Sequence, residues 1–397
     1  MPQSTIMAQC EALKTAWEYT PSDHLLHLLP LHHIHGIINA ILTPILAGST
    51  IEFLFPFNPS TVWSRLAAPL LPATSASPLP PKITFFTAVP TVYSRLMSTH
   101  KDLAPEVQSA ARDAVSPRNM RLSISGSAAL PTPTKLAWRE LSRGSILLER
   151  YGMTEVGMAL SCGLDPADRV DASVGWPLPS VQARLVDTDT NTVIPDTEYD
   201  QQGEIQLRGP TIFREYWRNP SATKAEFTIA EPSDPNQNPW FRTGDVALRR
   251  PVPSAGLSSL PSQSPWAQGP LYFIQGRKSA DIIKTGGEKV SALEIERELL
   301  SLPQISEAAV VAVPSGSWGH KVGAVLVLDK DHFAKENKPA KWSRMDMRRA
   351  LQDSLAKYKI PQVLKVVESI PKNAMGKINK KQLVKEVFAD EHSADEL

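Results

Sequence analysis

The segment that decides the fold reads Glu149-Arg150-Tyr151-Gly152-Met153-Thr154-Glu155, and it starts where the apolar stretch 146–149 ends. We predict a buried strand over 146–149, so the hydroxyl of Thr154 and the carboxylate of Glu155 follow a strand directly. In open α/β sheets, ligands bind beyond the carboxyl ends of strands. A Thr hydroxyl can donate to a phosphate oxygen, and a Glu carboxylate can hold a hard cation such as Mg²⁺. A capped turn would give the same pattern, so this segment alone leaves both interpretations open.

Upstream of this segment, short apolar runs alternate with helical stretches. Proline stands at the start of several of the helical stretches, where its missing N–H is not needed. Alternation of strand and helix predicts an α/β fold, in which crossover helices pack on mixed sheets. The predicted strands are 24–29, 50–55, 83–89, 121–125 and 146–149, and the predicted helices are 5–17, 37–46, 59–67, 90–100 and 131–142.

The second half of the chain has a different pattern. Short strands separated by turn-rich loops predict a small β subdomain, interrupted by a Pro-, Ser- and Gly-rich stretch at 250–270 that we expect to be a long, mobile insertion. A small α+β unit follows. We therefore predict a core domain over 1–276 and a small C-terminal domain over 279–397. The predicted elements are strands 182–187, 203–208, 245–249, 271–275, 307–313 and 323–328, and helices 292–300 and 343–357.

Composition excludes several classes of protein. The 397 residues are 42% hydrophobic and 21% charged, which is enough for a sizeable core. Lys and Arg total 42 against 41 Asp and Glu, so the chain has no broad attraction for nucleic acid or an anionic membrane. Its two cysteines exclude a disulfide framework and a Cys-rich zinc module. No apolar run reaches the roughly 18 residues of a spanning helix, and no secretory signal is evident, so we expect a cytoplasmic protein.

Weaker motifs follow other predicted strands. The small residues Ser125-Gly126-Ser127-Ala128-Ala129 would allow a flat ligand to approach the backbone, or would form only a tight turn. Asp245, behind Gly244, is suited to accept both hydroxyls of a ribose, and Arg277 could donate to the same sugar or its phosphate. Lys377 follows a glycine in a loop and could meet an oxyanion, although most surface lysines are only solvated.

In their order along the chain, these motifs resemble the adenylate-forming superfamily of acyl-CoA synthetases, firefly luciferases and peptide-synthetase adenylation domains. The resemblance covers essentially the whole chain and includes Leu29-Pro30-Leu31-His32-His33-Ile34-His35-Gly36 and Trp240-Phe241-Arg242-Thr243-Gly244-Asp245. Segments 149–155, 213–217 and 281–294 are most similar to malonyl-CoA synthetases.

The resemblance implies a two-step reaction that uses ATP, Mg²⁺ and coenzyme A. A carboxylate attacks the α-phosphate of ATP to give an acyl-adenylate and pyrophosphate, and the thiol of coenzyme A then displaces AMP. Lys377 would bridge the carboxylate and phosphate oxygens in the first transition state, with Thr154 at the α-phosphate and Glu155 on Mg²⁺. The other implied positions are Gly126, Ser127, Ala128 and Tyr151 beside adenine, Asp245 and Arg277 at the ribose, Ser279 at the domain hinge, and Gly286, Gly287 and Lys289 at coenzyme A.

A buried dicarboxylate needs a cation, because an unpaired buried carboxylate is costly. By position, Arg150 and Arg95 are expected to hold the second carboxylate of malonate in bidentate fashion, which would reject acetate and fatty acids. Either arginine could instead pair with a nearby Glu. His33 or His35 is expected to line the acyl pocket; a zinc site is disfavoured, because no cysteine accompanies the histidines.

The sequence departs from the family pattern at its start. Relatives carry a phosphate loop just upstream of the segment equivalent to 5–17, and we expect the sequence as given to lack that loop and the whole first subdomain. Three interpretations follow: a ligase with a shortened chain, a remnant limited to thioester formation, or a non-catalytic remnant that binds nucleotide, coenzyme A or a partner. Retention of Lys377, Glu155 and Asp245 favours a ligase, either for malonate or for another acid feeding polyketide or fatty-acid metabolism. A lost leader would make it mitochondrial, and the oligomeric state stays open.

Overall fold

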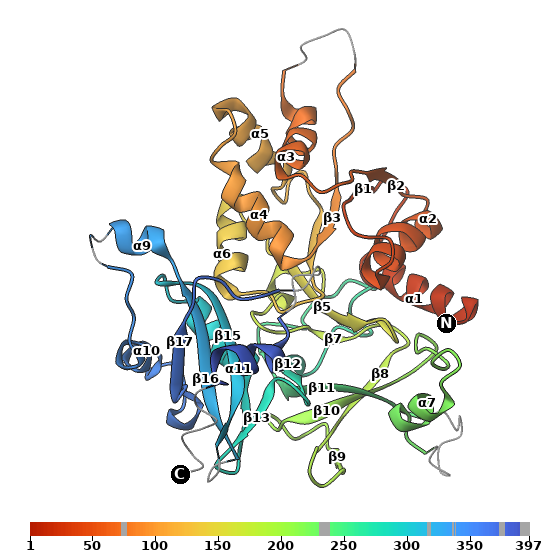
Figure 1. The fold of residues 1–397 in the computed structure, drawn as a ribbon. Helices are drawn as coiled ribbons and strands as arrows, with labels where there is room; N and C mark the ends of the chain where they lie inside the picture. Colours follow the sequence, from red (N-terminus) through yellow and green to blue (C-terminus); the bar gives the residue numbers. More distant parts are fainter. Residues whose placement is uncertain are drawn as a thin grey trace. The chain divides into compact units, whose positions relative to one another are not determined.

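The computed structural model describes residues 1–72, 78–229, 239–315, 319–335, 337, 339–372 and 378–389. Its contacts divide the chain into two units, both drawn in Figure 1. The large unit contains residues 1–130, 134–243 and 248–273, and the small unit contains residues 131–133, 244–247 and 274–397. The main division, between residues 273 and 274, lies just before the boundary that the sequence predicts at 276–279.

A seven-stranded sheet organises the large unit, with the strand order β2-β1-β3-β4-β5-β6-β7. The first five strands are parallel, and β5, β6 and β7 pair in antiparallel fashion. This arrangement confirms the mixed α/β sheet that the alternation of elements predicts. The strands are β1 (His24–His27), β2 (Thr50–Phe53), β3 (Phe85–Ala88), β4 (Leu122–Ser125), β5 (Leu148–Met153), β6 (Gly157–Ser161) and β7 (Trp176–Pro177).

Prolines start most of the crossover helices, as expected. The predicted helices 59–67 and 90–100 are found at those bounds, and 131–142 is found one residue shorter at each end. The stretch 37–46 differs, because it folds as a π-helix that continues into a short α-helix, and wide turns of this kind are frequent at functional sites. The elements are α1 (Gln3–Ala16), η1 (His35–Leu42), α2 (Thr43–Ala47), α3 (Pro59–Ala67), η2 (Ala68–Leu70), α4 (Pro90–His100), α5 (Pro105–Ala114), α6 (Thr132–Leu141), η3 (Pro166–Asp168) and α7 (Pro220–Glu226).

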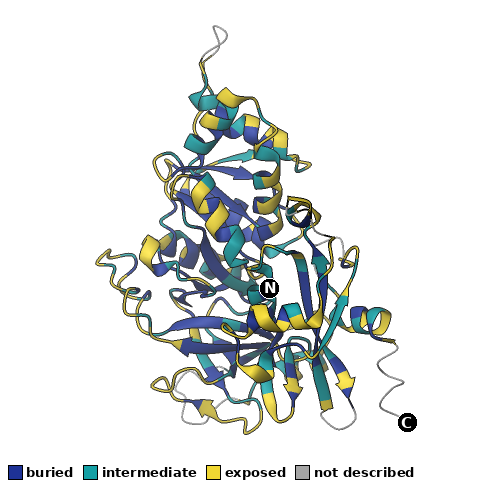
Figure 2. Cartoon of the chain, turned by 90° about the vertical axis from the view of Figure 1, so that its left-hand side faces the viewer, coloured by how far each residue is buried: buried dark blue, intermediate teal, exposed yellow. Residues whose placement is uncertain are grey.

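Aromatic side chains form much of the core between these helices and the sheet. The Trp138 ring stacks on Trp63 with centroids 6.3 Å apart and meets Tyr93 edge-on at 4.8 Å, and all three residues are fully buried. The Tyr93 hydroxyl donates to the carbonyl of Ile124 in β4 at 2.8 Å. Strands β1, β3, β4 and β6 are buried along their whole length, and buried strands are coloured dark blue in Figure 2. This packing fixes α4 against the strand that precedes the predicted Gly126 turn.

The predicted β subdomain is a five-stranded sheet in the order β12-β11-β10-β8-β9. Strands β8, β9 and β10 pair in antiparallel fashion. The pairing confirms the strands that the sequence predicts and adds a short one, β9. The bounds are β8 (Gln182–Val186), β9 (Val193–Ile194), β10 (Gly203–Arg208), β11 (Phe241–Arg250) and β12 (Leu271–Arg277).

The insertion between β11 and β12 is held in place rather than loose. Gln263 is fully buried; its Nε2 donates to the Ala16 carbonyl at 2.9 Å, and its Oε1 accepts from Leu164 N at 3.1 Å. Gly256 N donates to a carboxylate oxygen of Asp168 at 2.7 Å. The mobility expected from the Pro-, Ser- and Gly-rich composition therefore does not match the structure, because composition does not reveal where a single glutamine finds its partners.

The small unit is built on a sheet in the order β14-β13-β16-β15, with β17 parallel to β16. Side chains of β15 alternate between two cores, with Val310 on one face and Ala309 and Val311 on the other. The predicted helix 343–357 is shorter, because Ser343 caps α10 together with Asp346 and the helix ends at Leu351. The elements are β13 (Ile282–Thr285), β14 (Glu288–Ser291), α8 (Ala292–Leu300), β15 (Ile305–Ser315), β16 (Gly319–Leu328), α9 (Lys330–Lys335), α10 (Arg344–Leu351), η4 (Lys357–Lys359), β17 (Val363–Val366) and α11 (Lys380–Val387).

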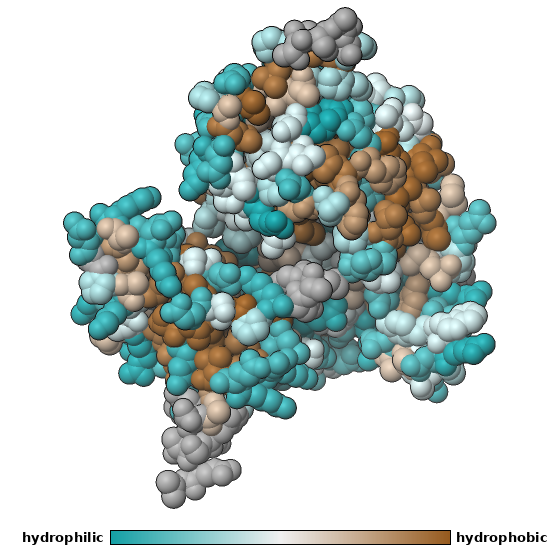
Figure 3. All heavy atoms as spheres, turned by 45° about the horizontal axis from the view of Figure 1, so that its top comes forward, coloured by the Kyte–Doolittle hydropathy of each residue, from teal (hydrophilic) through white to brown (hydrophobic). Residues whose placement is uncertain are grey.

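Strand β2 forms an edge of the seven-stranded sheet and exposes apolar side chains. Phe53 is 60% exposed, Phe55 is 80% exposed, and Ile45 of the neighbouring α2 is 62% exposed. Figure 3 shows a hydrophobic area on the large unit. Within the described ranges, none of the helices has the length and apolar character needed to cross a bilayer.

Candidate active site

Arg150 packs against the backbone at Gly126, on the neighbouring strand end. A Cβ at position 126 would lie 2.5 Å from both Cζ and Nε of Arg150, so any larger residue there would require the guanidinium to shift. Arg150 is 4% exposed, and its Nη2 donates to Ser127 Oγ at 3.1 Å. Burial lowers the pKa of Arg150 from 12.5 to about 9, which still leaves the side chain charged at neutral pH.

Among the described residues, this buried cation has no carboxylate partner and its Nε has no hydrogen-bond acceptor. Buried charges in proteins are ordinarily paired, since desolvation is costly. An unpaired buried guanidinium beside a glycine turn is therefore suited to receive an anionic group from a ligand.

His35 completes the cluster around Arg150. It is 3% exposed, its Nε2 lies 2.6 Å from Thr87 Oγ1, and its Nδ1 lies 3.4 Å from Ser127 Oγ. Burial, together with the nearby Arg150 charge, lowers the pKa of His35 well below its usual range, so the ring is neutral at pH 7. A neutral imidazole can accept as well as donate, and Thr87 fixes its orientation.

The turn 125–129 connects this buried cluster to the surface. Ser125 and Gly126 are buried, whereas Ser127 and Ala128 are exposed. Ser127 has φ of 69°, a conformation that is uncommon outside glycine and often marks functional sites. The predicted nucleotide-side residues Gly126, Ser127 and Ala128 thus adjoin the predicted acyl-pocket residues Arg150 and His35.

Thr154 and Glu155 lie in the loop between β5 and β6, directly after a strand as the sequence predicts. Thr154 is exposed, and Glu155 is half-buried. Glu155 Oε1 accepts from the Tyr216 hydroxyl at 3.0 Å, and the Glu155 carbonyl accepts from Phe213 N at 2.7 Å. Mg²⁺ needs only one or two protein carboxylates when phosphate oxygens and water supply the rest. Among the described residues Oε2 of Glu155 has no hydrogen-bond donor, so the residues present fit such an ion.

Tyr151 extends β5, which runs to Met153 and so is longer than the predicted strand 146–149. Its hydroxyl lies 3.9 Å from Met153 Sδ, and the side chain is partly exposed. The predicted adenine-side residue Tyr151 therefore lies near the end of β5, one position after Arg150.

The other two predicted acyl-pocket residues lie differently. Arg95 is exposed on α4, and its guanidinium stacks over the Phe57 ring at 4.9 Å. His33 is half-buried, with its ring 4.2 Å from that of His32. Within the described part of the chain, the structure brings Arg150 and His35 together and does not place Arg95 in hydrogen-bonding contact with them.

In the small unit, Asp245 and Arg277 form an ion pair. Arg277 Nε lies 3.1 Å from Asp245 Oδ1; the Asp245 side chain is 10% exposed and that of Arg277 56% exposed. Lys278 N donates to the Gly244 carbonyl at 2.9 Å, which holds the two loops side by side. The two residues predicted to hold a ribose are therefore adjacent in space.

The remaining predicted positions are also in this unit. Ser279 is exposed in the turn after β12. Gly286 and Gly287 have φ of 55° and 88° and form the two-residue turn between β13 and β14, a turn that requires positive φ at both positions. Lys289 lies opposite Lys284 in that hairpin. Lys377 lies outside the described residues.

Two residues near the site, Thr87 and Tyr216, are not predicted as site residues from the sequence. Thr87, the partner of His35, is the one polar residue of the buried strand Phe85–Ala88, and a polar side chain there is a signal that could have been used. Tyr216 lies in the aromatic segment 213–217, which supported the family resemblance without suggesting a contact to Glu155.

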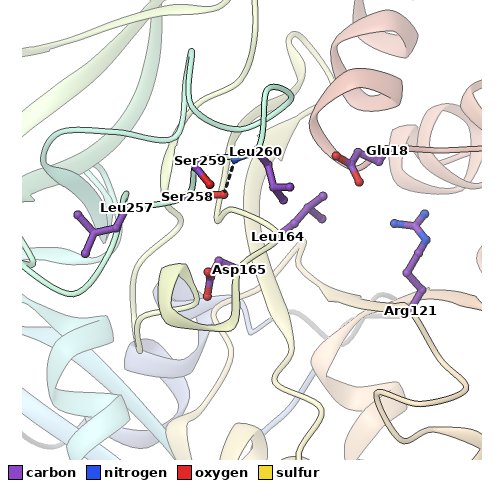
Figure 4. A pocket seen from close by; sticks show the side chains of 8 residues that line it. All are labelled: Glu18, Arg121, Leu164, Asp165, Leu257, Ser258, Ser259 and Leu260. Carbon is purple, nitrogen blue, oxygen red and sulfur yellow. Dashed lines mark hydrogen bonds between the residues drawn. The ribbon is translucent and has the colours of Figure 1, made fainter.

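A separate pocket of about 430 Å³ on the large unit contains none of the predicted site residues (Figure 4). Arg121 at its edge pairs with Asp23 at 2.8 Å, so its charge is already compensated. The residues that line this pocket are Glu18, Arg121, Leu164, Asp165, Leu257, Ser258, Ser259 and Leu260.

In the described ranges, no group of three or more His, Cys, Asp or Glu residues could hold a metal ion.

Comparison with known proteins identifies two matching family models. The model of the AMP-binding enzymes matches residues 1–217, and the model of the AMP-binding enzyme C-terminal domain matches residues 294–377.

Curated relatives are similar along nearly the whole chain. A CoA ligase of Gibberella moniliformis is 54% identical over 98% of this chain and 66% of its own length. The mitochondrial malonate–CoA ligase of Mus musculus is 40% identical over 96% of this chain and 61% of its own length. The chain thus spans less than two thirds of the length of these relatives.

Solved structures agree with this relationship. The ATP-bound MatB crystal structure from Rhodopseudomonas palustris matches with a TM-score of 0.73 and 31% identity, over 96% of this chain and 63% of that chain. The ATP-bound RpMatB-BxBclM chimera B3 matches with a TM-score of 0.75 and 30% identity, over 98% of this chain and 65% of that one.

Proposed function

The chain belongs to the AMP-binding enzyme family, and we propose that it converts malonate, ATP and coenzyme A into malonyl-CoA, AMP and pyrophosphate. The observation that carries the choice of malonate is the buried, carboxylate-free guanidinium of Arg150. The mouse relative, a malonate–CoA ligase by name, supports the same acid.

Arg150 and His35 would recognise the carboxylate of malonate that does not react. The guanidinium offers donors in a fixed fork, and neutral His35, held by Thr87, adds a hydrogen bond without a second charge. A monocarboxylic acid would leave Arg150 buried and unpaired. The pocket therefore selects against acetate and fatty acids by the cost of an unsatisfied buried charge.

In the first step, an oxygen of the other carboxylate forms a bond to the α-phosphorus of ATP, and the bond to the β-phosphate oxygen breaks to release pyrophosphate. Thr154 would donate to the α-phosphate, and Lys377 would meet the charge that builds up on the carboxylate and phosphate oxygens. Gly126, Ser127, Ala128 and Tyr151 would flank adenine.

In the second step, the thiolate of coenzyme A attacks the acyl carbon, and AMP leaves with the oxygen that joined it to the acyl group. Asp245 would accept the ribose hydroxyls, and Arg277, its ion-pair partner, would donate to the sugar. Gly286, Gly287 and Lys289 would border coenzyme A, with Ser279 as the hinge between the two steps.

Glu155 would hold Mg²⁺, which supplies charge neutralisation for the ATP phosphates when bound. Tyr216 donates to Oε1 of Glu155, so Oε2 would be the oxygen that could hold the ion.

Pyrophosphate release with malonate, methylmalonate, acetate and octanoate tests the proposal. We expect release with malonate to exceed that with acetate by at least about 10²-fold, because leaving a buried charged group without its partner costs about 3 kcal/mol or more. Equal turnover of acetate would overturn the malonate assignment. Coenzyme A-dependent consumption of supplied malonyl-adenylate, measured in parallel, separates a chain limited to thioester formation from one that performs both steps.

For the compartment, the mitochondrial name of the mouse relative favours the mitochondrial alternative over a cytoplasmic location. Fractionation of cells of the source organism, with the native protein followed by antibody, tests this. Recovery with cytosolic markers alone would exclude it.

A further inference from the structure

Three charged side chains meet in the small unit, outside the residues given roles above. Lys380 Nζ lies 2.5 Å from Asp281 Oδ1 and 2.8 Å from Glu296 Oε1. The side chains of Lys380, Asp281 and Glu296 are 12%, 15% and 14% exposed. They come from three segments. Asp281 lies in residues 276–281, the end of β12 and the turn before β13, which we call the connector. Glu296 lies in α8, and Lys380 is the first residue of α11.

Each carboxylate also accepts a backbone N–H. Asp281 Oδ2 accepts from Arg277 N at 2.9 Å, and Glu296 Oε1 accepts from Val310 N at 2.8 Å. Burial by itself would lower the pKa of Lys380, but the two carboxylates outweigh it and the pKa is raised. The lysine is therefore a fixed cation that joins three pieces of chain.

Within the connector, Asp281 packs closely against Gly276. A Cβ at Gly276 would lie 2.3 Å from the Asp281 Cβ, and Asp281 N donates to the Arg277 carbonyl at 2.8 Å. The connector carries Arg277, the ion-pair partner of Asp245, and the exposed Ser279. At the other end of the bridge, Lys380 follows Lys377 by three positions in the sequence.

We propose that Lys380 is a positioning residue that ties the start of α11 to the connector 276–281 through Asp281. Any displacement of the connector is then transmitted to the chain that enters α11. Its catalytic consequence rests on the proposed function: adenylate formation depends on the link more strongly than thioester formation does, because Lys377 acts only in the first step.

Two substitutions separate this role from simple stabilisation of the fold. Asp281 accepts from Lys380 and from Arg277 N with different carboxylate oxygens. The amide of Asp281→Asn has only one acceptor oxygen, so it can accept from one of these donors but not from both. In Glu296→Gln the single oxygen Oε1 already accepts from both Lys380 and Val310 N, so its hydrogen bonds remain. Both variants remove one negative charge and leave Lys380 with one carboxylate. Lys330→Gln, in the exposed pair with Glu368, is the surface control.

Hydrogen exchange of the whole chain measures the link without any substrate. We expect Asp281→Asn to speed amide exchange at least tenfold both at Arg277 and in the first turn of α11, with Glu296→Gln and Lys330→Gln within twofold of the parent. Equal changes in Asp281→Asn and Glu296→Gln, or a change in only one of the two segments, would overturn the proposal. If Asp281→Asn does not fold, the double variant Lys380→Met/Glu296→Gln removes one charge of each sign and leaves residue 380 without a donor for Asp281, and the same amides are followed.

The half-reactions give the catalytic readout. We expect Asp281→Asn to lower malonate-dependent ATP–pyrophosphate exchange at least tenfold relative to Glu296→Gln, while thioester formation from supplied malonyl-adenylate changes less than threefold. Equal loss in both half-reactions would mean that the triad only stabilises the fold. If the parent chain shows no malonate-dependent exchange, the proposed function fails, and the hydrogen-exchange result still decides whether the link exists.

Discussion

Two neighbouring residues of β5 show two buried cations in contrasting surroundings: Glu149 binds the cation Lys135, and Arg150 is itself a cation. Glu149 accepts from Lys135 Nζ at 2.9 Å; Asp171 lies 3.1 Å from the same nitrogen, and the Arg169 carbonyl accepts from it at 2.9 Å. Arg150 is the next residue and is a cation itself. Within the described ranges, the acceptor of its side-chain hydrogen bond is a hydroxyl, that of Ser127, and no carboxylate pairs with it.

The comparison separates a buried charge that stabilises the fold, because it is paired within the chain, from a buried charge that is available to bind a ligand. Burial alone would lower the pKa of Lys135, but Glu149, Cys162 and Asp171 outweigh it and the pKa is raised. Burial lowers the pKa of Arg150 to about 9, with only a weak opposing contribution from Tyr19. Lys135 is fully compensated in the folded chain, whereas Arg150 carries an uncompensated desolvation cost that a bound carboxylate would offset.

The largest effect is expected for Lys135→Met. It leaves Glu149 buried without its cation, which typically costs about 3–5 kcal/mol of folding free energy. Urea unfolding followed by tryptophan fluorescence measures the loss. Lys135→Met/Glu149→Gln should recover part of it, and a loss below about 1 kcal/mol for the single variant would contradict the structural role given to this pair.

Arg150→Met should have the opposite profile. We expect the same unfolding measurement to show unchanged or increased stability, because a desolvated, unpaired charge is removed. The kcat/KM for malonate should fall about 10²-fold, while that for acetate changes less than about threefold. Destabilisation comparable to that of Lys135→Met would show that the two cations do not differ as proposed.

Gly126→Ala tests the contact beneath the guanidinium. The added Cβ would meet Cζ and Nε of Arg150 at 2.5 Å, so the side chain must shift. Overpacking of this kind costs about 1–3 kcal/mol, and we expect the KM for malonate to rise about tenfold. In the Arg150→Met background the same change should leave the KM for malonate nearly unaltered; an equal rise there would place the effect elsewhere.

The smallest effect concerns pH. The pKa of His35 is lowered in the fold, chiefly by burial and next by Arg150, so the unfolded chain binds the extra proton more readily. This contribution to stability is fully present above the unfolded pKa of about 6.5 and is lost as the pH falls below it. From pH 6.5 to 5.5 the parent should lose up to about 1 kcal/mol more than His35→Asn, since the unfolded imidazole is already half protonated at the start of this range. The measurement is the free energy of unfolding of both proteins between pH 5.5 and 6.5. Parallel curves for the two proteins would rule out a contribution of His35 to the pH dependence of stability.

Much of the fold follows from local pattern. The prolines at 59 and 90 and the periodic apolar residues behind them predict α3 and α4 at their observed bounds. Pattern does not predict α5 or the early end of α10. The helix α10 ends at Leu351, and three residues of turn, 352–354, follow it. Sequence periodicity cannot detect a helix end of this kind.

The site was predictable as a set of residue types, but not as a set of contacts. The motif 149–155 marks a strand end with a hydroxyl and a carboxylate, and the structure places both there. It does not reveal that Tyr216 holds Glu155 or that Thr87 holds His35, because these partners are 61 and 52 residues apart in the sequence. The mobility expected of 250–270 failed for the same reason, since Gln263 finds its partners in α1 and after β6.

The sequence by itself determined the alternation of strands and helices, the family, and the residues that carry charge. The tertiary structure alone decided which charges are compensated. Glu149 and Arg150 are adjacent and equally buried, yet one has a counter-charge and the other does not. Whether a buried ion is paired depends on side chains that distant segments bring to each face of a strand, and this information is present only in the folded chain.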